Sequence, residues 1–398
     1  MKPADRRRLT PLTILFFTVF LDLVGFGIVI PLLPLYAETF GASPMAVVWL
    51  VAIYSLMQFV FAPWWGQLSD RVGRRPVLLV GLFGSAISYL AFGLAGSLAM
   101  LFIARALAGI MGANIGVAQA YVADITAPEE RAKGMGMIGA AFGLGFIFGP
   151  AIGGGLSYFG PSVPFLAAAA LAFVNGLLAI RWLGESRPPG EPSTLPQPGF
   201  RARFETLSAF ASRGRGGTLF AVFFLLTFAF AALEATFSLW ADRRWDFSPS
   251  QVAYLFAYIG VLITLVQGAL VGPLVRRLGE RRLAVAGSAT LAVGLVAIPA
   301  APSIPWLAVA LALLALGQGT TIPAISALIS RAAPPGQQGR LLGVSQSLSA
   351  LGRVLGPVLG GLVFARISIG APYVGGGLVA ILALLLLTRI SAPSPAQR

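Results

Sequence analysis

The 398-residue sequence contains no cysteine and no histidine. Without cysteine, the protein has no disulfide, no thiolate nucleophile and no cysteine ligand for a metal. Without histidine, a Ser-His-Asp triad and a histidine-bound zinc or haem are excluded. These two absences remove most enzyme classes, so we expect a protein that is not an enzyme and that holds no metal.

Charge is also scarce. Only 11% of the residues are charged and 57% are hydrophobic, and the mean hydropathy is +0.85. A soluble domain usually has about 25% charged residues. So few charges cannot cover a water-exposed surface of this size, and the composition therefore indicates a polytopic membrane protein.

Long apolar runs are abundant. A helix needs about 20 apolar residues to cross the hydrocarbon layer of a bilayer. Twelve runs meet this requirement, at residues 12–36, 46–68, 77–96, 99–123, 135–158, 163–183, 218–240, 251–273, 283–300, 304–329, 341–364 and 372–389. We therefore predict an all-α membrane protein with twelve transmembrane helices.

The 28 basic residues determine the predicted orientation. If both termini are cytoplasmic, 23 of them lie on the inner side, Arg243, Arg244 and Arg366 lie outside, and Arg105 and Arg353 lie within spans. Cytoplasmic loops of membrane proteins carry an excess of Lys and Arg. This distribution predicts cytoplasmic termini, and it explains the net charge of +14 through contact with the lipid bilayer, without a nucleic-acid partner.

The two halves of the chain resemble each other. Span 5 carries a glycine-rich motif made of Gly136, Gly145, Gly149, Pro150, Gly153 and Gly154. The same spacing returns 207 residues later in span 11, from Gly343 to Gly361. We therefore predict two six-helix bundles, residues 1–183 and 217–398, related by duplication. Parallel repeats of this kind place a binding site between the halves, near the midplane.

Residues 184–216 join the two predicted bundles. The segment begins with several prolines, which suit an extended linker. Phe200, Phe204, Leu207 and Phe210 then recur at helical spacing among arginines. This pattern is compatible with a short amphipathic helix on the inner membrane surface, and equally with a disordered linker.

The loop after span 2 reads Gly-Gln-Leu-Ser-Asp-Arg-Val-Gly-Arg-Arg from residue 66 to 75. Arginines at this rim are ordinary membrane anchors, but an acid among them is unexpected. The pattern Gly-x-Leu-x-Asp-Arg-x-Gly-Arg-Arg resembles the signature of the major facilitator superfamily. The glycine motif of span 5 resembles the antiporter motif of its drug:proton exporters. Residues 21–34 in span 1 and 54–64 in span 2 resemble the tetracycline-exporter branch.

This resemblance implies the major facilitator fold and a function. A member of this family is expected to export drugs or related amphipathic compounds in exchange for protons, by alternating access. It is expected to work as a monomer in the bacterial inner membrane. The resemblance also implies a cytoplasmic gate, in which Asp70, Arg74 and Asp124 meet the start of span 11 when the transporter opens outward. The candidate gate residues are Gly66, Asp70, Arg71, Gly73, Arg74, Arg75 and Asp124. For the span 5 motif, a sealing bend at Pro150 and plain close packing both remain open.

Ionisable residues inside spans are costly, at about 2.5–3.5 kcal/mol each on insertion scales. Asp22 lies at the midplane of span 1, and Arg105 lies at a similar depth in span 4. We expect Asp22 to bind a proton or a cationic substrate in alternation, with Arg105 adjusting its affinity. The alternative is a static salt bridge between the two spans. Glu234 in span 7 is either a second coupling acid or a carboxylate of the outer vestibule.

The chain departs from the tetracycline exporters at three places. Those proteins carry an acid where this chain has Ser88. They also carry an acid in span 9 and a histidine in span 8, and this chain has neither. These three differences speak against tetracycline as the substrate. A cavity suited to amphipathic and cationic compounds is expected instead, although each of its aromatic residues could also face lipid or the core. The candidate cavity residues are Tyr54, Gln58, Asn114, Phe237, Tyr254, Tyr258 and Gln318.

No Gly-x4-Gly-Lys-[Ser/Thr] motif is present, so ATP is not expected to drive the protein. We therefore expect no cofactor, and a proton gradient as the energy source. Two other functions remain open: an importer or lipid-linked-sugar flippase of the same superfamily, and a membrane receptor or scaffold that does not transport. The span 5 motif speaks against the first, and the intact Asp22, Asp70 and both repeat motifs speak against the second.

Overall fold

The structure is a computed structural model that describes residues 10–112, 115–126, 131–186, 215–332 and 338–389. Within these ranges all regular secondary structure is helical, and twelve helical segments are long and apolar enough to cross a membrane. The predicted all-α membrane fold is therefore confirmed. Most of the segment 184–216, including its predicted amphipathic helix, lies outside the described residues.

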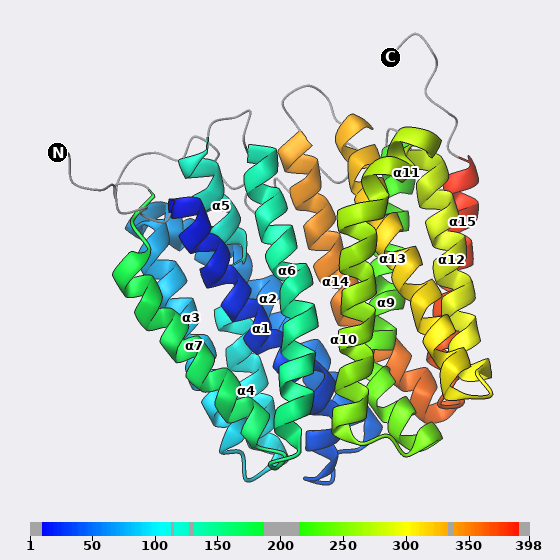
Figure 1. The fold of residues 1–398 in the computed structure, drawn as a ribbon, viewed down its shortest axis with the longest axis horizontal. Coiled ribbons are helices and arrows are strands. Elements are labelled where there is room, and N and C mark those ends of the chain that lie inside the picture. Colours follow the sequence, from blue (N-terminus) through cyan, green and yellow to red (C-terminus); the bar gives the residue numbers. More distant parts are fainter. Residues whose placement is uncertain (1–9, 113–114, 127–130, 187–214, 333–337, 390–398) are drawn as a thin grey trace, which may run out of the picture.

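Six transmembrane passages form the first half of the chain (Figure 1). They are α1 Pro11–Glu38, α2 Pro44–Val72, α3 Arg74–Gly93, α4 Leu98–Met111 with α5 Ile115–Ile125, α6 Arg131–Ser157 and α7 Val163–Trp182. The other six are α9 Arg215–Trp245, α10 Pro249–Leu265 with η2 Val266–Leu270 and α11 Val271–Leu278, α12 Glu280–Ala300, α13 Ile304–Ala332, α14 Gln338–Arg366 and α15 Ala371–Arg389.

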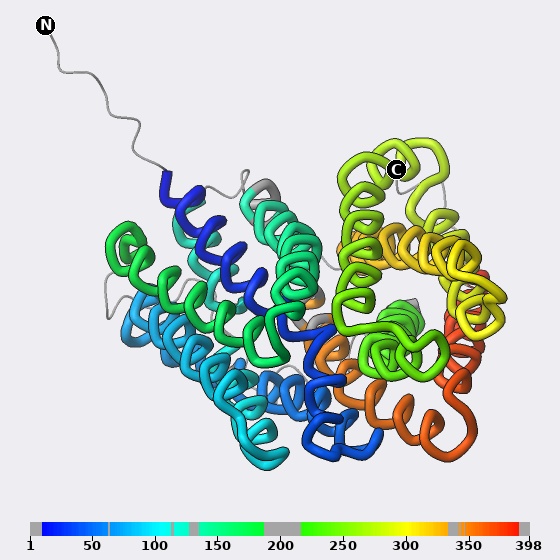
Figure 2. The backbone as a smooth tube through the Cα atoms, turned by 60° about the horizontal axis from the view of Figure 1, so that its bottom comes forward, coloured from blue at the N-terminus to red at the C-terminus, as the bar shows by residue number. Residues whose placement is uncertain are grey.

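The two halves form separate groups of helices, which Figure 2 shows from blue to green and from light green to red. They meet mainly where α2 contacts α14 and where α6 contacts α10. Several helices are longer than their apolar runs, because a run marks only the part inside hydrocarbon. Helix α2, for example, continues to Val72 in the polar rim.

The eighth passage contains the short π-helical segment η2, and the repeat explains it. The N-cap residues Ser43 of α2 and Ser248 of α10 are 205 residues apart, whereas the glycines that end the two passages, Gly73 and Gly279, are 206 apart. The second copy therefore holds one extra residue. A π-helical turn absorbs one inserted residue without breaking the helix.

The glycine motifs pack in the same way in both halves. A Cβ atom on Gly149 would lie 2.6 Å from the Cα atom of Gly27 on α1. On the repeat residue Gly356, it would lie 2.5 Å from the backbone oxygen of Phe228 on α9. Because only glycine permits such an approach, each motif fixes its helix against the first helix of its own half.

The last glycine of each motif faces the opposite half. Gly154 of α6 approaches Ala253 of α10, and its repeat residue Gly361 of α14 approaches Val48 of α2. The two interfaces between the halves are therefore related by the same repeat. Small residues allow these four helices to come together at one end of the molecule.

The two ends of the bundle differ in charge. We call the end that holds the α2–α3 and α11–α12 turns the arginine-rich face; it bears Arg71, Arg74, Arg75, Arg181, Arg276, Arg277, Arg281, Arg282, Arg331 and Arg389. The first turn of α1 and the last turn of α15 lie at this same end (Figure 1). The opposite end, which holds the α1–α2 and α9–α10 connections, is the arginine-poor face.

Polar contacts between the halves lie toward the arginine-poor face. Near this face the hydroxyls of Ser157 on α6 and Ser250 on α10 are 2.6 Å apart. The Ser238 hydroxyl of α9 donates to the carbonyl of Pro31 on α1 over 2.9 Å. Beyond them, Arg243 of α9 pairs with Glu38 of α1 at 3.1 Å. We call these contacts the seam; they join the halves on the arginine-poor side.

Candidate functional site

The α2–α3 turn brings the predicted gate residues together. Gly73 adopts φ +99°, a left-handed conformation that glycine accepts without strain, and the chain reverses there. The reversal buries the Arg74 side chain, whose residue is 3% exposed. Arg74 pairs with Asp70 at 2.6 Å and with Asp124, at the end of α5, at 3.1 Å. The turn is thereby fastened to the end of the fourth passage.

The remaining predicted gate residues surround this pair. The carbonyl of Gly66 accepts a hydrogen bond from Ser69, whose hydroxyl in turn accepts one from Arg74. Arg75 donates to the carbonyl of Ile180 near the end of α7, over 2.7 Å, and Arg71 is exposed. All these contacts lie within the first half, so the expected contact of Asp70 with span 11 stays a prediction for another conformation.

Glu185 belongs to this site, although the sequence reasoning missed it. Its Oε1 atom accepts a hydrogen bond from the backbone N–H of Arg74 over 2.9 Å, and its Oε2 atom accepts one from that of Arg75 over 3.2 Å. The carboxylate thus caps the first turn of α3, where the helix dipole favours an anion. The available signal was an acid directly after span 6, on the same side of the membrane as the start of span 3.

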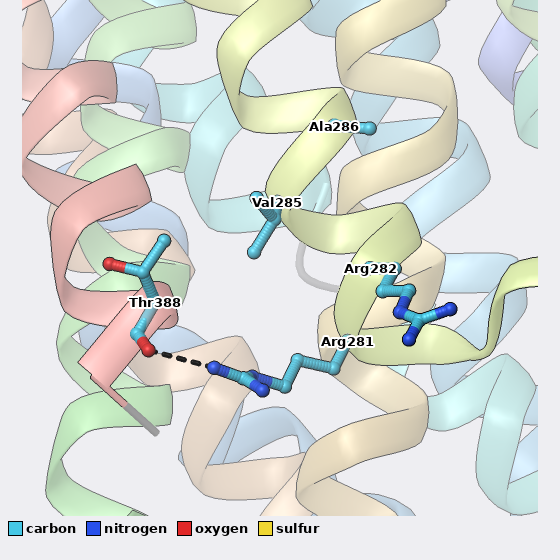
Figure 3. Close-up of a pocket in the computed structure, with 5 residues that line it drawn as sticks. All are labelled: Arg281, Arg282, Val285, Ala286 and Thr388. Atoms are coloured by element: carbon cyan, nitrogen blue, oxygen red, sulfur yellow. Dashed lines mark hydrogen bonds between the residues drawn. The ribbon is translucent and has the colours of Figure 1, made fainter. Parts of the chain in front are cut away.

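The second half holds a related cluster at the α11–α12 turn. Glu280, the first residue of α12, pairs with Arg331 at the end of α13 over 2.5 Å. Arg281 donates to the carbonyl of Thr388 in the last turn of α15 over 2.7 Å (Figure 3). Arg281 and Thr388 also line a surface pocket of about 270 Å³ between α12 and α15, together with Arg282, Val285 and Ala286. The pocket lies at the rim of one half, away from the helices that join the halves.

A second group of charged residues lies inside the spans. Asp22 comes from α1, and its Oδ1 atom is buried without a hydrogen-bond partner. Arg105 of α4 is 3% exposed, and its guanidinium carbon lies 4.4 Å from the ring centroid of Tyr54 on α2. We call Asp22, Tyr54, Arg105, Glu234 and Arg353 the central cluster.

Asp22 and Arg105 do not pair with each other in the described part of the chain. The static salt bridge that we considered between spans 1 and 4 is therefore absent from this conformation. Arg105 interacts electrostatically with Glu234 of α9, and so does Arg353 of α14. Arg353 also donates to the Ser349 hydroxyl one turn earlier on its own helix, over 2.7 Å. The electrostatic interaction of Arg105 with Glu234 thus links the two halves.

The predicted cavity residues have different surroundings. Gln58 donates to the carbonyl of Gly112, Tyr258 donates to the carbonyl of Ala308, and the Oε1 atom of Gln318 is buried without a partner. Tyr254 is 44% exposed beside Gly154. Asn114 lies outside the described residues. Their role in binding stays a prediction.

Phe237 differs from the expectation. It is fully buried, and its ring packs against Trp240 and Phe256 inside the second half. An aromatic side chain on a helix between two other aromatics contributes to core packing. It therefore lines no open cavity in this conformation. Ser88, which stands where the tetracycline exporters carry an acid, is also buried and donates to the carbonyl of Gly84.

Comparison with known proteins identifies the family. The sequence profile of the Major Facilitator Superfamily matches residues 15–271 and 244–398. The chain belongs to the major facilitator superfamily. It is thus a membrane transporter and not an enzyme. Its fold agrees with solved members: the human organic anion transporter MFSD10 (TETRAN) superimposes with a TM-score of 0.73 at 29% identity, covering 97% of this chain and 100% of that one.

Two bacterial relatives of this major facilitator protein are drug-resistance proteins. The class C tetracycline resistance protein of Escherichia coli is 37% identical over 361 residues, which cover 89% of each chain. Multidrug resistance protein 2 of Bacillus subtilis is 31% identical over 387 residues, which cover 96% of each chain. The resemblance to drug exporters that the motifs indicated is therefore confirmed over most of the chain.

Proposed function

We propose that this transporter exports amphipathic, drug-like compounds across a bacterial inner membrane in exchange for protons. The central cluster carries the proposal. Two acids and two arginines that lie inside the spans and come from both halves all act electrostatically on Tyr54. Buried ionisable residues in a membrane are retained at a cost and typically mark the path of an ion or substrate.

The orientation of the cycle follows from the distribution of charge. The positive-inside rule supports a cytoplasmic position for the arginine-rich face, and the proposed topology has both termini there. In this orientation the seam joins the halves on the periplasmic side, and we assign the conformation to the inward-facing part of the cycle. Outward opening would break the seam and bring the gate around Asp70, Arg74 and Asp124 against the other half.

Asp22 is the proposed proton carrier. Its unpartnered oxygen is available to a proton or to a cationic group, and one site cannot hold both. This competition makes export depend on proton entry. Glu234, between Arg105 and Arg353, is the proposed second acid of the coupling site. The transporter is proposed to work as a monomer, because each half supplies part of one central cluster.

Purified protein in proteoliposomes tests the proposal. An imposed pH gradient should drive accumulation of a cationic dye such as ethidium or of norfloxacin, and each transported compound should discharge the gradient. Asp22→Asn should abolish this coupled uptake at normal expression. Asp246→Asn is the matched control: the residue is exposed, and its φ of 54° suits asparagine.

Two results would overturn the assignment. Full coupling in the Asp22 variant would remove that residue as proton carrier. Uptake that proceeds without protons, or with the gradient reversed, would favour the importer or flippase function.

A further inference from the structure

Arg105 has hydrogen-bond donors that no group among the described residues satisfies. Its Nε and Nη1 atoms are buried and lack a partner, and the residue is 3% exposed. Its guanidinium carbon lies 4.4 Å from the centroid of the Tyr54 ring and 6.0 Å from that of the Phe26 ring. An aromatic face attracts a cation but does not replace a hydrogen-bond acceptor.

Such a group is unusual, because buried polar atoms in proteins are nearly always hydrogen-bonded. Burial of an unpaired charge is costly, and a guanidinium presents a planar fork of donors that matches a carboxylate. No acid among the described residues lies within ion-pair distance of Arg105. The open donors therefore indicate an acceptor that arrives from outside the protein.

Asp22 presents the complementary gap. Its Oδ1 atom is buried and accepts no hydrogen bond. Asp22 and Arg105 both act electrostatically on Tyr54 and on Tyr89 of α3, although they do not pair. An acceptor and a donor group, each without a hydrogen-bond partner, thus act electrostatically on the same two tyrosines. A substrate with only a cationic group would satisfy Asp22 and leave Arg105 unmatched.

The other half supplies the remaining charges near this site. Glu234 of α9 interacts with Arg105 and Arg353, and Arg353 of α14 already donates to Ser349. When Asp22, Glu234, Arg105 and Arg353 are all ionised, their charges sum to zero. A substrate of zero net charge that carries both signs leaves this balance unchanged, whereas a simple anion or cation would disturb it.

We propose that the transported compound is amphoteric: an anionic oxygen binds the open donors of Arg105, and a protonatable nitrogen competes with the proton at Asp22. The proposal rests on the exporter function above and specifies its substrate class. Arg105 then positions the substrate, while the proton that is exchanged is still carried by the acids of the central cluster and not by Arg105. The anionic group of the substrate raises its affinity for the site through Arg105. It does not compete with the proton at Asp22.

Three probes of one scaffold test this class: norfloxacin, which has a carboxylate and a secondary amine, its methyl ester, which keeps only the amine, and its N-acetyl derivative, which keeps only the carboxylate. Counterflow in proteoliposomes measures their recognition without a pH gradient. Wild-type protein should prefer norfloxacin over its ester by about 10-fold or more, the value of a charge-assisted hydrogen bond. The N-acetyl derivative should be exchanged without discharging a pH gradient.

Variants of Arg105 distinguish a role in substrate binding from a role in the stability of the fold. Arg105→Gln should lower norfloxacin exchange relative to ester exchange until the two rates are equal, and Arg105→Lys should recover part of the preference. Arg366→Gln, the same substitution at an exposed arginine, is the matched control. Thermal unfolding of each purified variant shows whether it is folded.

The outcomes are distinct. Equal exchange of norfloxacin and its ester by wild type, or an equal loss of both in folded Arg105→Gln, overturns the amphoteric site and assigns Arg105 a structural role. A preserved preference in counterflow with no response to a pH gradient supports the site while removing proton coupling, so failure of the exporter function is recognised separately.

Discussion

The two halves of the protein repeat their packing but not their interior charges. Gly149 and Gly356 bring α6 and α14 against equivalent helices. Arg353, however, stands at the repeat position of Phe146, 207 residues earlier. Ser97 precedes α4 and Ser303 precedes α13. Arg105 and the buried Leu311 lie at the same distance in sequence from these two serines, so Leu311 is the repeat position of Arg105. Features that build the fold were kept in both copies, and the charges proposed for transport occur in one copy each.

The arginine-rich face shows a second form of this difference. In the first half a base on the turn, Arg74, binds an acid on the fourth passage. In the second half an acid on the turn, Glu280, binds the base Arg331. In each half an ion pair joins the turn to the end of the fourth passage, but the acid and the base have exchanged positions. The Arg74 side chain is 4% exposed and that of Arg331 is 71% exposed. The first pair is therefore expected to contribute far more to stability.

The largest effect should come from breaking the buried pair. Arg74→Ala leaves Asp70 and Asp124 without their partner, and removing one member of a buried ion pair costs about 3–5 kcal/mol. Arg331→Ala is the matched change in the other half and should cost less than about 1 kcal/mol, as exposed pairs do. The midpoint of thermal unfolding in detergent measures both. Similar losses would contradict the asymmetry between the halves.

The glycine motifs should respond symmetrically. Gly149→Val and Gly356→Val each place side-chain atoms against a neighbouring helix backbone, and overpacking of this kind costs about 1–3 kcal/mol. The two variants should lose similar stability in the same unfolding assay. Gly136→Val is the control, because no atom lies within 4 Å of a Cβ there. A loss confined to Gly149→Val would favour a special role for the span 5 motif.

The cap on α3 should have a smaller effect. Glu185→Ala removes the acceptor for two backbone N–H groups, and loss of a helix cap costs about 0.5–2 kcal/mol. Glu185→Gln keeps one neutral acceptor and should fall between that variant and wild type. Hydrogen exchange of the Arg74 and Arg75 amides reports on the cap directly. Unchanged protection in Glu185→Ala would show that the carboxylate does not hold this turn.

The smallest effect is expected at the seam. Glu38→Gln breaks a partly exposed pair with Arg243 and should change stability by less than about 1 kcal/mol. It should nevertheless shift the transporter toward outward opening. Distances between spin labels on the α1–α2 and α9–α10 connections would detect the shift. A distribution identical to wild type would show that the pair does not contribute to closure.

The sequence predicted the twelve spans because the thickness of hydrocarbon demands long apolar runs, whatever the helices pack against. It also predicted a depth for each buried charge. Depth along a helix does not determine its rotation, and for this reason the pairing of Asp22 with Arg105 could not be decided. The burial of Phe237 and the capping by Glu185 likewise depend on which helix faces which, and one sequence does not encode that in any local pattern.

The strength of the seam also affects the rate of the transport cycle. It consists of serine hydroxyls, a backbone carbonyl and one partly exposed ion pair. A neutral hydrogen bond contributes about 0.5–1.5 kcal/mol, so its polar contacts together hold only a few kcal/mol. One charge that crosses a membrane potential of 100 mV releases about 2.3 kcal/mol. The free energy that holds the seam closed is thus similar to the free energy released when one or two protons enter. A more stable seam would open more slowly and would slow each transport cycle.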